Sequence, residues 1–270
     1  MTAYPFAADA PVHVAKVGLK ARDADMLVDY YKNILGLAEL KRSADRIVLG
    51  VAGDGLGLLD IERAPSLKPD DPREAGLFHT AFLLPTRADL ARWVKRAIDE
   101  RITLDGASDH LVSEALYLSD PEGNGIEIYA DRPKDAWRRE GSQIAMATER
   151  LDIDGLLAEP GALERDWSGA PVGTIVGHVH LRVGDPREAE AWWQGEMGFD
   201  TMAKYGSQAV FLSTGGYHHH IGANSWRSAG AGKRDTERAG LSFVELTAHD
   251  GKAKTITDPW GTEIRVEAKG

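Results

Sequence analysis

The sequence predicts an α+β fold made of four units, each a strand, a helix and further strands, with the helix missing from the last unit. Residues 16–37 (KVGLKARDADMLVDYYKNILGL) and 178–199 (HVHLRVGDPREAEAWWQGEMGF) follow one plan: a strand, an Asp, a helix and a Gly. A second repeat is the turn Asp-Pro-x-Gly, at Asp120 and at Asp258, which suits a tight reversal into a following strand. These repeats place the starts of the four units near residues 13, 76, 174 and 240.

The first and third units carry clear signals of a helix after the opening strand. The strands alternate apolar and polar residues with period two, Asp23 and Asp185 are suited to cap the helices, and Pro186 stands at the favoured first helical position. Apolar residues recur every three or four positions and give each helix one apolar stripe. These residues are Leu27, Tyr30, Tyr31 and Ile34 in one helix, and Ala189, Trp192, Trp193 and Met197 in the other.

The second and fourth units differ in length. The second has room for an amphipathic helix, whose apolar residues are Leu90, Trp93, Val94, Ala97 and Ile98. The stretch from Gly240 to Asp258 is too short for a helix, so we expect a turn at residues 249–251 (His-Asp-Gly) instead. Residues 133–172 are charged, contain scattered Gly and Pro, and show no repeat, which predicts a connector with a short helix around residues 153–157.

The composition indicates a globular protein without nucleic-acid or membrane partners. The chain has 270 residues, 43% of them hydrophobic, and a net charge of −10, so no basic face large enough to track phosphates is expected. The start MTAYPFAADAP does not resemble a secretory signal, and no apolar run approaches the roughly 20 residues that cross a bilayer. We therefore expect a soluble, cytoplasmic protein. Because there is no cysteine, any metal must be held by nitrogen and oxygen ligands.

Two long strings carry a resemblance to a known family: GASDHLVSEALYLSDPEGNGIEIYADRP (residues 106–133) and YGSQAVFLSTGGYHHHIGANSW (residues 205–226). With the repeated units, they resemble the vicinal-oxygen-chelate superfamily of glyoxalases, bleomycin-resistance proteins and extradiol dioxygenases, and within it the bacterial catechol 2,3-dioxygenases. The resemblance covers nearly all of the chain outside the connector. It implies βαβββ units paired into half-barrel sheets, with one domain over residues 10–132, a connector over 133–172 and a shortened second domain over 173–270.

The resemblance also implies one divalent metal held by two histidines and a glutamate. In the family pattern, a His opens the first unit of a pair, a second His opens the next unit, and the Glu lies on that unit's last strand. His79 and Glu127 match this pattern in the second unit, and His178 matches it in the third. The remaining ligand positions of the first and fourth units hold other residues, namely Lys16, Phe243 and Arg265.

The residues that the family pattern places around the metal are divided in the same way. His110 and Tyr117 match in the second unit, and His219 is the best match in the third for an acid-base histidine. Units two and three thus hold complementary halves of one set, so we predict that they pair, within one chain or across an oligomer interface, and that units one and four serve structure. A separation of more than about 10 Å between His79 and His178 would contradict this pairing, given metal–nitrogen bonds of roughly 2 Å.

Several assignments stay open. His180 lies two residues beyond His178 on the same strand face, so a shift in register would exchange the two. Strand alternation sends His219 to one face and both His218 and His220 to the other, where they line a surface or brace the site. Tyr117 could instead be a buried structural residue, and Trp226 is a weak candidate for the pocket wall.

The resemblance implies extradiol cleavage of a catechol by dioxygen at iron(II), with manganese(II) as the alternative metal. His219, His110 and Tyr117 would be the catalytic residues, and we expect a homo-oligomer. Two alternatives stay open. One is a glyoxalase-like or epimerase-like metal lyase or isomerase, in which Asp60 or Glu62 supplies a second carboxylate. The other is a metal-free module that sequesters a small aromatic compound.

Overall fold

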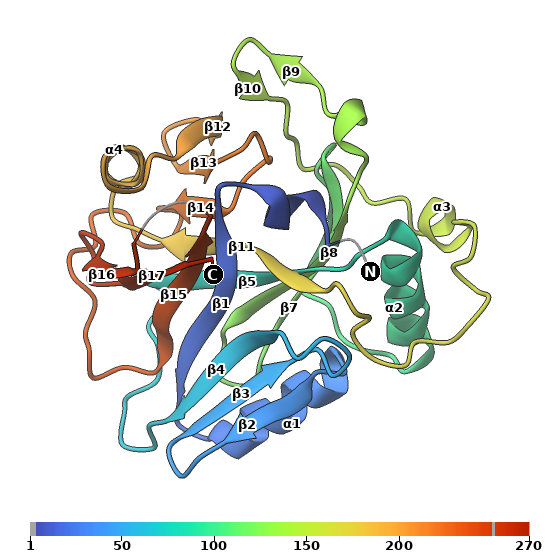
Figure 1. Cartoon of the computed structure of the whole chain (residues 1–270), viewed down its shortest axis with the longest axis horizontal. Helices are drawn as coiled ribbons and strands as arrows, with labels where there is room; N and C mark the ends of the chain where they lie inside the picture. The colour runs from blue at the N-terminus through green and yellow to red at the C-terminus, as the bar shows by residue number, and fades with distance from the viewer. Residues whose placement is uncertain (1–3, 250–251, 270) are drawn as a thin grey trace.

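Four units are visible in the computed structural model, which describes residues 4–249 and 252–269, and the first three of them contain a helix after the opening strand (Figure 1). The first two units comprise β1 (Val12–Ala21), α1 (Ala24–Ile34), β2 (Ala38–Arg42), β3 (Arg46–Gly50) and β4 (Gly57–Arg63), then β5 (Gly76–Leu83), α2 (Arg87–Asp99), β6 (Gly106–Asp109), β7 (Ser113–Ser119) and β8 (Gly125–Asp131). The last two comprise β11 (Ile175–Arg182), α4 (Pro186–Met197), β12 (Asp200–Tyr205), β13 (Ala209–Ser213) and β14 (Ile221–Asn224), then β15 (Gly240–Ala248), β16 (Lys254–Thr257) and β17 (Glu263–Ala268).

The short elements lie before the first unit and in the connector. They are the 3-10 helices η1 (Phe6–Asp9) and η2 (Lys134–Ala136), the strands β9 (Arg139–Glu140) and β10 (Gln143–Ile144), and the helix α3 (Ile153–Leu157). The helix expected around residues 153–157 is therefore confirmed. Of the turn expected at residues 249–251, Asp250 and Gly251 lie outside the described residues.

The predicted helix caps and turns are confirmed by their hydrogen bonds. The Asp23 side chain accepts from the backbone N–H of Met26, and Asp185 accepts from that of Arg187. In the turn at Asp120, the carboxylate accepts from two following backbone N–H groups, and the carboxylate of Asp258 does the same.

One expected core residue of α2 lies outside the core. Ile98 is 54% exposed, whereas the other four residues of the predicted stripe are buried. It follows the buried Ala97 directly and so lies about 100° further round the helix, on the solvent side. The apolar stripe of α2 is therefore one residue narrower than the sequence suggested.

Two curled sheets make the α+β fold, and each joins two units. The strand orders are β16-β17-β15-β1-β4-β3-β2 and β12-β13-β14-β11-β5-β8-β7-β6. Antiparallel pairing of β1 with β15 joins units one and four, and antiparallel pairing of β5 with β11 joins units two and three. The predicted pairing of units two and three is thus confirmed, and it occurs within one chain. Each sheet takes strands from both of the sequence segments 10–132 and 173–270.

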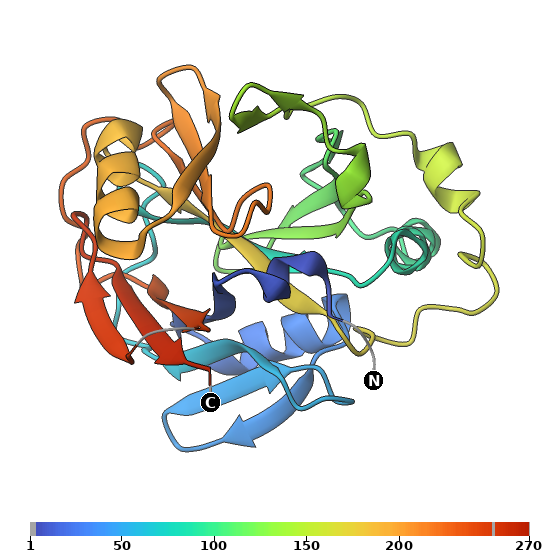
Figure 2. The same cartoon turned by 45° about the horizontal axis from the view of Figure 1, so that its top comes forward.

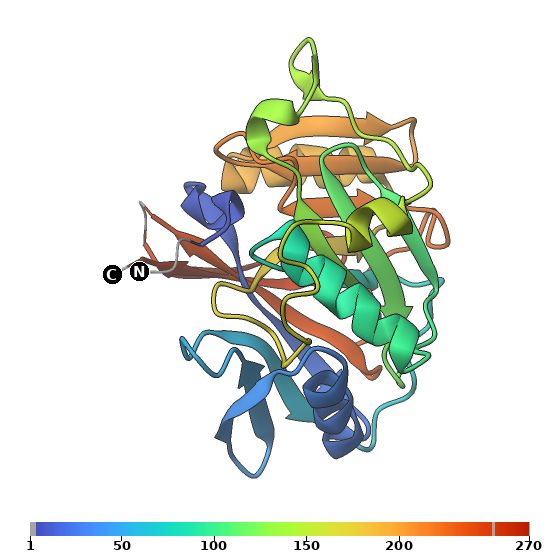
Figure 3. The same ribbon diagram turned by 90° about the vertical axis from the view of Figure 1, so that its right-hand side faces the viewer.

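The two sheets pack against each other through their central strands, as the side view shows (Figure 3). One core cluster contains Val17 of β1, Val244 of β15, Phe82 of β5 and Val179 of β11. Because strand side chains alternate between faces, the histidines that flank Val179 point away from this core. The opposite face of the eight-stranded sheet is therefore free to form a site.

The connector reaches across that face. Its hairpin β9–β10 lies beside β12 (Figure 2), and Ile144 is buried in a second, smaller apolar cluster. Backbone hydrogen bonds between Asp109 and Glu149 attach the next part of the connector to β6. Within residues 4–249 and 252–269, none of the helices combines the length and apolar character that crossing a membrane requires.

Candidate metal centre

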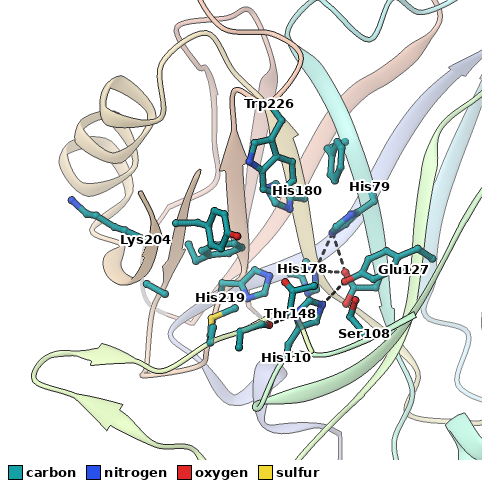
Figure 4. Close-up of a pocket in the computed structure, with 17 residues that line it drawn as sticks. His79, Ser108, His110, Glu127, Thr148, His178, His180, Lys204, His219 and Trp226 are labelled. Carbon is teal, nitrogen blue, oxygen red and sulfur yellow. Dashed lines mark hydrogen bonds and ion pairs between the residues drawn. The ribbon is translucent and has the colours of Figure 1, made fainter. Parts of the chain in front are cut away.

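Three adjacent strands bring His79, Glu127 and His178 to one point. Ala81 on β5 lies opposite His178 of β11 on one side and Glu127 of β8 on the other. His79 lies two residues before Ala81 and therefore on the same face of β5. All three side chains are buried and point into the cavity above the sheet (Figure 4).

The spacing of the three side chains fits a metal ion. His79 Nε2 lies 3.0 Å and His178 Nε2 3.1 Å from Glu127 Oε2, and the two nitrogens are 3.3 Å apart. Neighbouring ligands at right angles around an ion, with bonds of about 2.1 Å, are separated by about 3.0 Å. The three atoms thus have the spacing of one face of an octahedron, the arrangement typical of non-haem iron(II) sites that leave positions open.

The electrostatics of the cluster favour metal-binding protonation states. Burial lowers the pKa of His178 to about 4, although Glu127 opposes this shift. Burial acts to raise the pKa of Glu127, but His178 and His79 hold it well below its usual range. A neutral imidazole and a carboxylate are therefore available near neutral pH, as divalent metals require. His178 Nδ1 has no hydrogen-bond partner among the described residues.

His110 and Tyr117 form a hydrogen-bonded pair beside Glu127. His110 Nδ1 lies 2.7 Å from the Ala147 carbonyl oxygen, which can only accept, so Nδ1 carries the proton. The other nitrogen, Nε2, then accepts from the Tyr117 hydroxyl at 2.6 Å. Burial and the nearby Glu127 raise the pKa of Tyr117 well above its usual value, which keeps this hydroxyl a donor.

His219 faces the cavity on the His178 side. The two rings lie 4.0 Å apart between centroids, and Phe211 packs against His219 from β13. Burial, reinforced by His178 and other neighbouring histidines, lowers the pKa of His219 well below its usual value. The ring is therefore neutral at physiological pH and has one unprotonated nitrogen.

His180, His218 and His220 are buried but do not join the cluster of three. His218 hydrogen-bonds Asp131, and His220 hydrogen-bonds Ser213 and the Ala7 carbonyl. The run 218–220 is not part of a strand, because β14 begins at Ile221, so the expected alternation does not apply to it. His180 lines the cavity with its ring 5.0 Å from that of His79, and its Nε2 has no partner among the described residues.

The cavity has a volume of about 500 Å³ and is lined mainly by apolar groups. Phe78 and Trp226 pack edge to face at its mouth, with ring centroids 5.2 Å apart. Met146 and Thr148 of the connector also line the cavity. The sequence reasoning missed Phe78, Phe211 and the connector residues. Phe78 stands directly before His79, and Phe211 lies within one of the quoted strings, as do the lining residues Ser108 and Tyr205, whereas Met146 and Thr148 lie near no recognised pattern.

In the seven-stranded sheet, the positions that correspond to the cluster of three hold other side chains, which make an ion pair and a stacking contact instead. Lys16 Nζ, at the position of His178, lies 3.0 Å from Glu245 Oε1. Arg265, at the position of Glu127, stacks on the Phe243 ring with its Cζ 3.6 Å from the centroid. A cation is already present where a metal ion would have to bind, so we assign no metal site to this sheet.

The two carboxylates considered for a lyase or isomerase site are distant from the cluster of three. Asp60 and Glu62 are on β4 in the seven-stranded sheet, and Asp60 Oδ1 accepts a hydrogen bond from Arg46 Nε at 2.9 Å. Among the described residues, the only potential metal-binding group with three ligands contains one carboxylate, that of Glu127.

Both the sequence and the fold have known relatives. Residues 11–128 match the family model of the Glyoxalase/Bleomycin resistance protein/Dioxygenase superfamily. A Bacillus subtilis (strain 168) protein named catechol-2,3-dioxygenase is 43% identical over 238 residues, which cover 87% of this chain and 82% of the relative.

A solved Bacillus subtilis structure named as a dioxygenase aligns with a TM-score of 0.59 at 13% identity, covering 95% of this chain and 84% of that chain. A glyoxalase I mutant from Zea mays aligns with a TM-score of 0.58 at 11% identity, covering 97% and 96%. At such identities the two structures show a common fold.

Proposed function

The chain belongs to the glyoxalase/bleomycin resistance protein/dioxygenase superfamily, and from this premise we propose that it is an extradiol dioxygenase that cleaves a catechol-type ring with dioxygen. The observation that carries the proposal is the arrangement of His79, His178 and Glu127 at octahedral spacing beside a cavity that also contains His219. The name of the relative that is 43% identical supports the same activity.

His79, His178 and Glu127 would hold the metal, which we propose to be iron(II), with manganese(II) as the alternative. When bound, the metal would supply Lewis acidity and open positions for the two oxygens of a catechol and for dioxygen. The neutral state of His178 and the ionised state of Glu127 suit this role at neutral pH.

The other polar side chains of the cavity would handle protons and orient the substrate. His219 would accept a proton from a catechol hydroxyl, as a neutral imidazole can. Tyr117 would accept a hydrogen bond from a substrate hydroxyl through its oxygen, since its single proton is already donated to His110 Nε2. His110 would support Tyr117 through the bond between Nε2 and the hydroxyl. The aromatic side chains Phe78, Phe211 and Trp226 would enclose the substrate ring.

The alternatives have less support. A lyase or isomerase site would need a second carboxylate at the metal, and Asp60 and Glu62 are in the other sheet. A metal-free binding module would not need His79, His178 and Glu127 to converge. Metal analysis of the purified protein separates a metal-free binding module, which would contain no stoichiometric metal, from either metal enzyme.

The decisive experiment is anaerobic loading with iron(II) or manganese(II), followed by a catechol and air. We expect the yellow ring-opened product with one metal per chain, and no product without metal. Glu127→Ala should lose the metal, whereas His219→Ala should keep the metal and lose turnover. Stoichiometric metal without any ring-opened product from a panel of catechols would refute the proposed activity. Equal loss of metal in both variants would show that the two roles are wrongly assigned.

A further inference from the structure

A chain of buried hydrogen bonds leads away from the cavity behind His219. His219 Nδ1 lies 2.7 Å from His218 Nδ1, and His218 Nε2 lies 2.9 Å from Asp131 Oδ1. Asp131 Oδ1 also accepts a hydrogen bond from the Tyr217 hydroxyl at 3.2 Å. The His218 side chain is fully buried, and the Trp137 ring packs against it with centroids 5.2 Å apart.

The chemistry of the acceptors determines where the protons lie. A carboxylate can only accept, so the proton of a neutral His218 lies on Nε2, which faces Asp131. The Nδ1 of His218 then has a lone pair and no proton, and the 2.7 Å contact forms only if His219 Nδ1 donates. A neutral His219 with its proton on Nδ1 has its lone pair on Nε2.

From this arrangement we propose that Asp131 and His218 are positioning residues that fix His219 in the tautomer with the proton on Nδ1 and the lone pair on Nε2. His219 lines the cavity, and its Nε2 makes no hydrogen bond to a described residue, so this nitrogen is available to the ligand. The inference rests on the proposed function, because only a catechol hydroxyl or a similar donor gives that lone pair a proton to accept. In the opposite tautomer, Nε2 would carry a proton and could not act as a base.

The fold gives a reason for this arrangement. Asp131 follows Glu127 by four residues on β8, so the two carboxylates lie on the same face of one strand. Tyr129, between them on that face, hydrogen-bonds the Tyr217 hydroxyl at 2.7 Å, and Tyr217 in turn hydrogen-bonds Asp131. Glu127, the candidate metal ligand, and Asp131, the group that orients His219 through His218, are therefore held at a constant separation by a single strand.

Two substitutions at position 218 separate the two bonds that its ring makes. In His218→Asn, the amide oxygen lies near the former Nδ1 and can still accept from His219, but it does not reach Asp131. In His218→Gln, the longer amide reaches toward Asp131 and leaves His219 Nδ1 without its acceptor. His220→Asn is the matched control, because His220 is equally buried but hydrogen-bonds Ser213 and Ala7 instead.

The primary measurement is the tautomeric state of the imidazole rings, from long-range proton–nitrogen NMR correlations of the full chain, metal-free and loaded with zinc(II). We expect the Nδ1-protonated signature for His219 in the wild type, in His218→Asn and in His220→Asn. In His218→Gln we expect the Nε2-protonated form to be populated. In iron-loaded protein, kcat for ring cleavage should fall roughly 100-fold in His218→Gln, with KM nearly unchanged, and only a few-fold in His218→Asn.

The outcomes separate this inference from the proposed function. Wild-type His219 with its proton on Nε2 would overturn the inference, whatever the activity and whether or not the variants fold. Equal losses of kcat in His218→Asn and His218→Gln, with unchanged tautomers, would also overturn it. The expected tautomers in a protein that cleaves no catechol would refute the dioxygenase proposal and leave the orientation of His219 established.

Discussion

Exchange of Glu127 for Gln should abolish the stabilisation of the protein by a divalent metal. Gln has nearly the same size and keeps an oxygen that can accept from the histidines, so the metal-free protein should lose at most about 1–2 kcal/mol. The amide is, however, a poor replacement for the single carboxylate among the three ligand atoms. Glu245→Gln is the matched control, because Glu245 lies in the equivalent part of the other sheet and pairs with Lys16 at partial exposure.

The expected magnitude follows from the linkage between binding and folding. A metal present at 100 times its dissociation constant stabilises the folded state by about 2.7 kcal/mol. For a chain of this size, that corresponds to a rise in Tm of roughly 5–10 °C. We expect this rise in the wild type and in Glu245→Gln, and none in Glu127→Gln.

The assay is anaerobic thermal unfolding with and without iron(II) or manganese(II), followed by metal analysis after desalting. The metal-free Tm values show whether each variant is folded. If Glu127→Gln gained as much Tm from the metal as Glu245→Gln, the assignment of Glu127 as a ligand would be wrong. If the Tm of the wild type did not rise with the metal, the proposal that the cluster of three binds a metal would be wrong.

Three further predictions concern stability and the pocket wall. Burial lowers the pKa of His220 from 6.5 to about 3, so its contribution to stability is complete above pH 6.5 and is lost as the pH falls from 6.5 toward 3. By pH 5 the part of the loss that is due to His220 should be about 2 kcal/mol, measured as the difference between the wild type and His220→Gln in how the free energy of unfolding changes with pH, and an equal pH dependence in the two proteins would contradict this source. Gly125→Ala would place a Cβ 2.1 Å from a backbone oxygen and 3.0 Å from the Cβ of His79, so it should destabilise the fold by about 1–3 kcal/mol and weaken metal binding. Gly195→Ala in α4 meets nothing within 4 Å and should instead stabilise the protein by about 0.5–1 kcal/mol, as equilibrium unfolding of both variants would show. Trp226→Ala should raise KM for a catechol by about 2–10-fold at unchanged kcat in steady-state assays, and an unchanged KM would remove Trp226 from the binding wall.

Local patterns in the sequence predicted the elements well, because each strand and helix is encoded by the spacing of its own apolar residues. The caps Asp23 and Asp185 and the paired Asp-Pro-x-Gly turns depend on hydrogen bonds within a few residues, so they too can be read from short stretches. The pairing of β5 with β11 has no local pattern. It was predicted only because His79 and Glu127 lacked a third ligand that His178 could supply.

The rest of the site depends on contacts between distant segments. Asp131 and His218 are separated by 87 residues; the sequence indicated that His218 could brace the site, but it gave His218 no partner and Asp131 no role. The connector wall at Met146 and Thr148 is set largely by backbone hydrogen bonds to the β6 edge, which any residue could form. Such contacts depend on how the tertiary fold brings distant segments together, so no local pattern in the sequence predicted them.

The strand order also determines when the molecule can complete its folding during synthesis. β1 is a central strand, but β15, its partner on one side, is synthesised long after it, since Val12 pairs with Ala248. Until then, one edge of β1 has unpaired N–H and C=O groups, and closure of so long a loop slows the pairing. A ribosome-bound chain that ends before residue 240 should therefore bind chaperones and be sensitive to protease, even though all residues of the candidate metal centre have already been made.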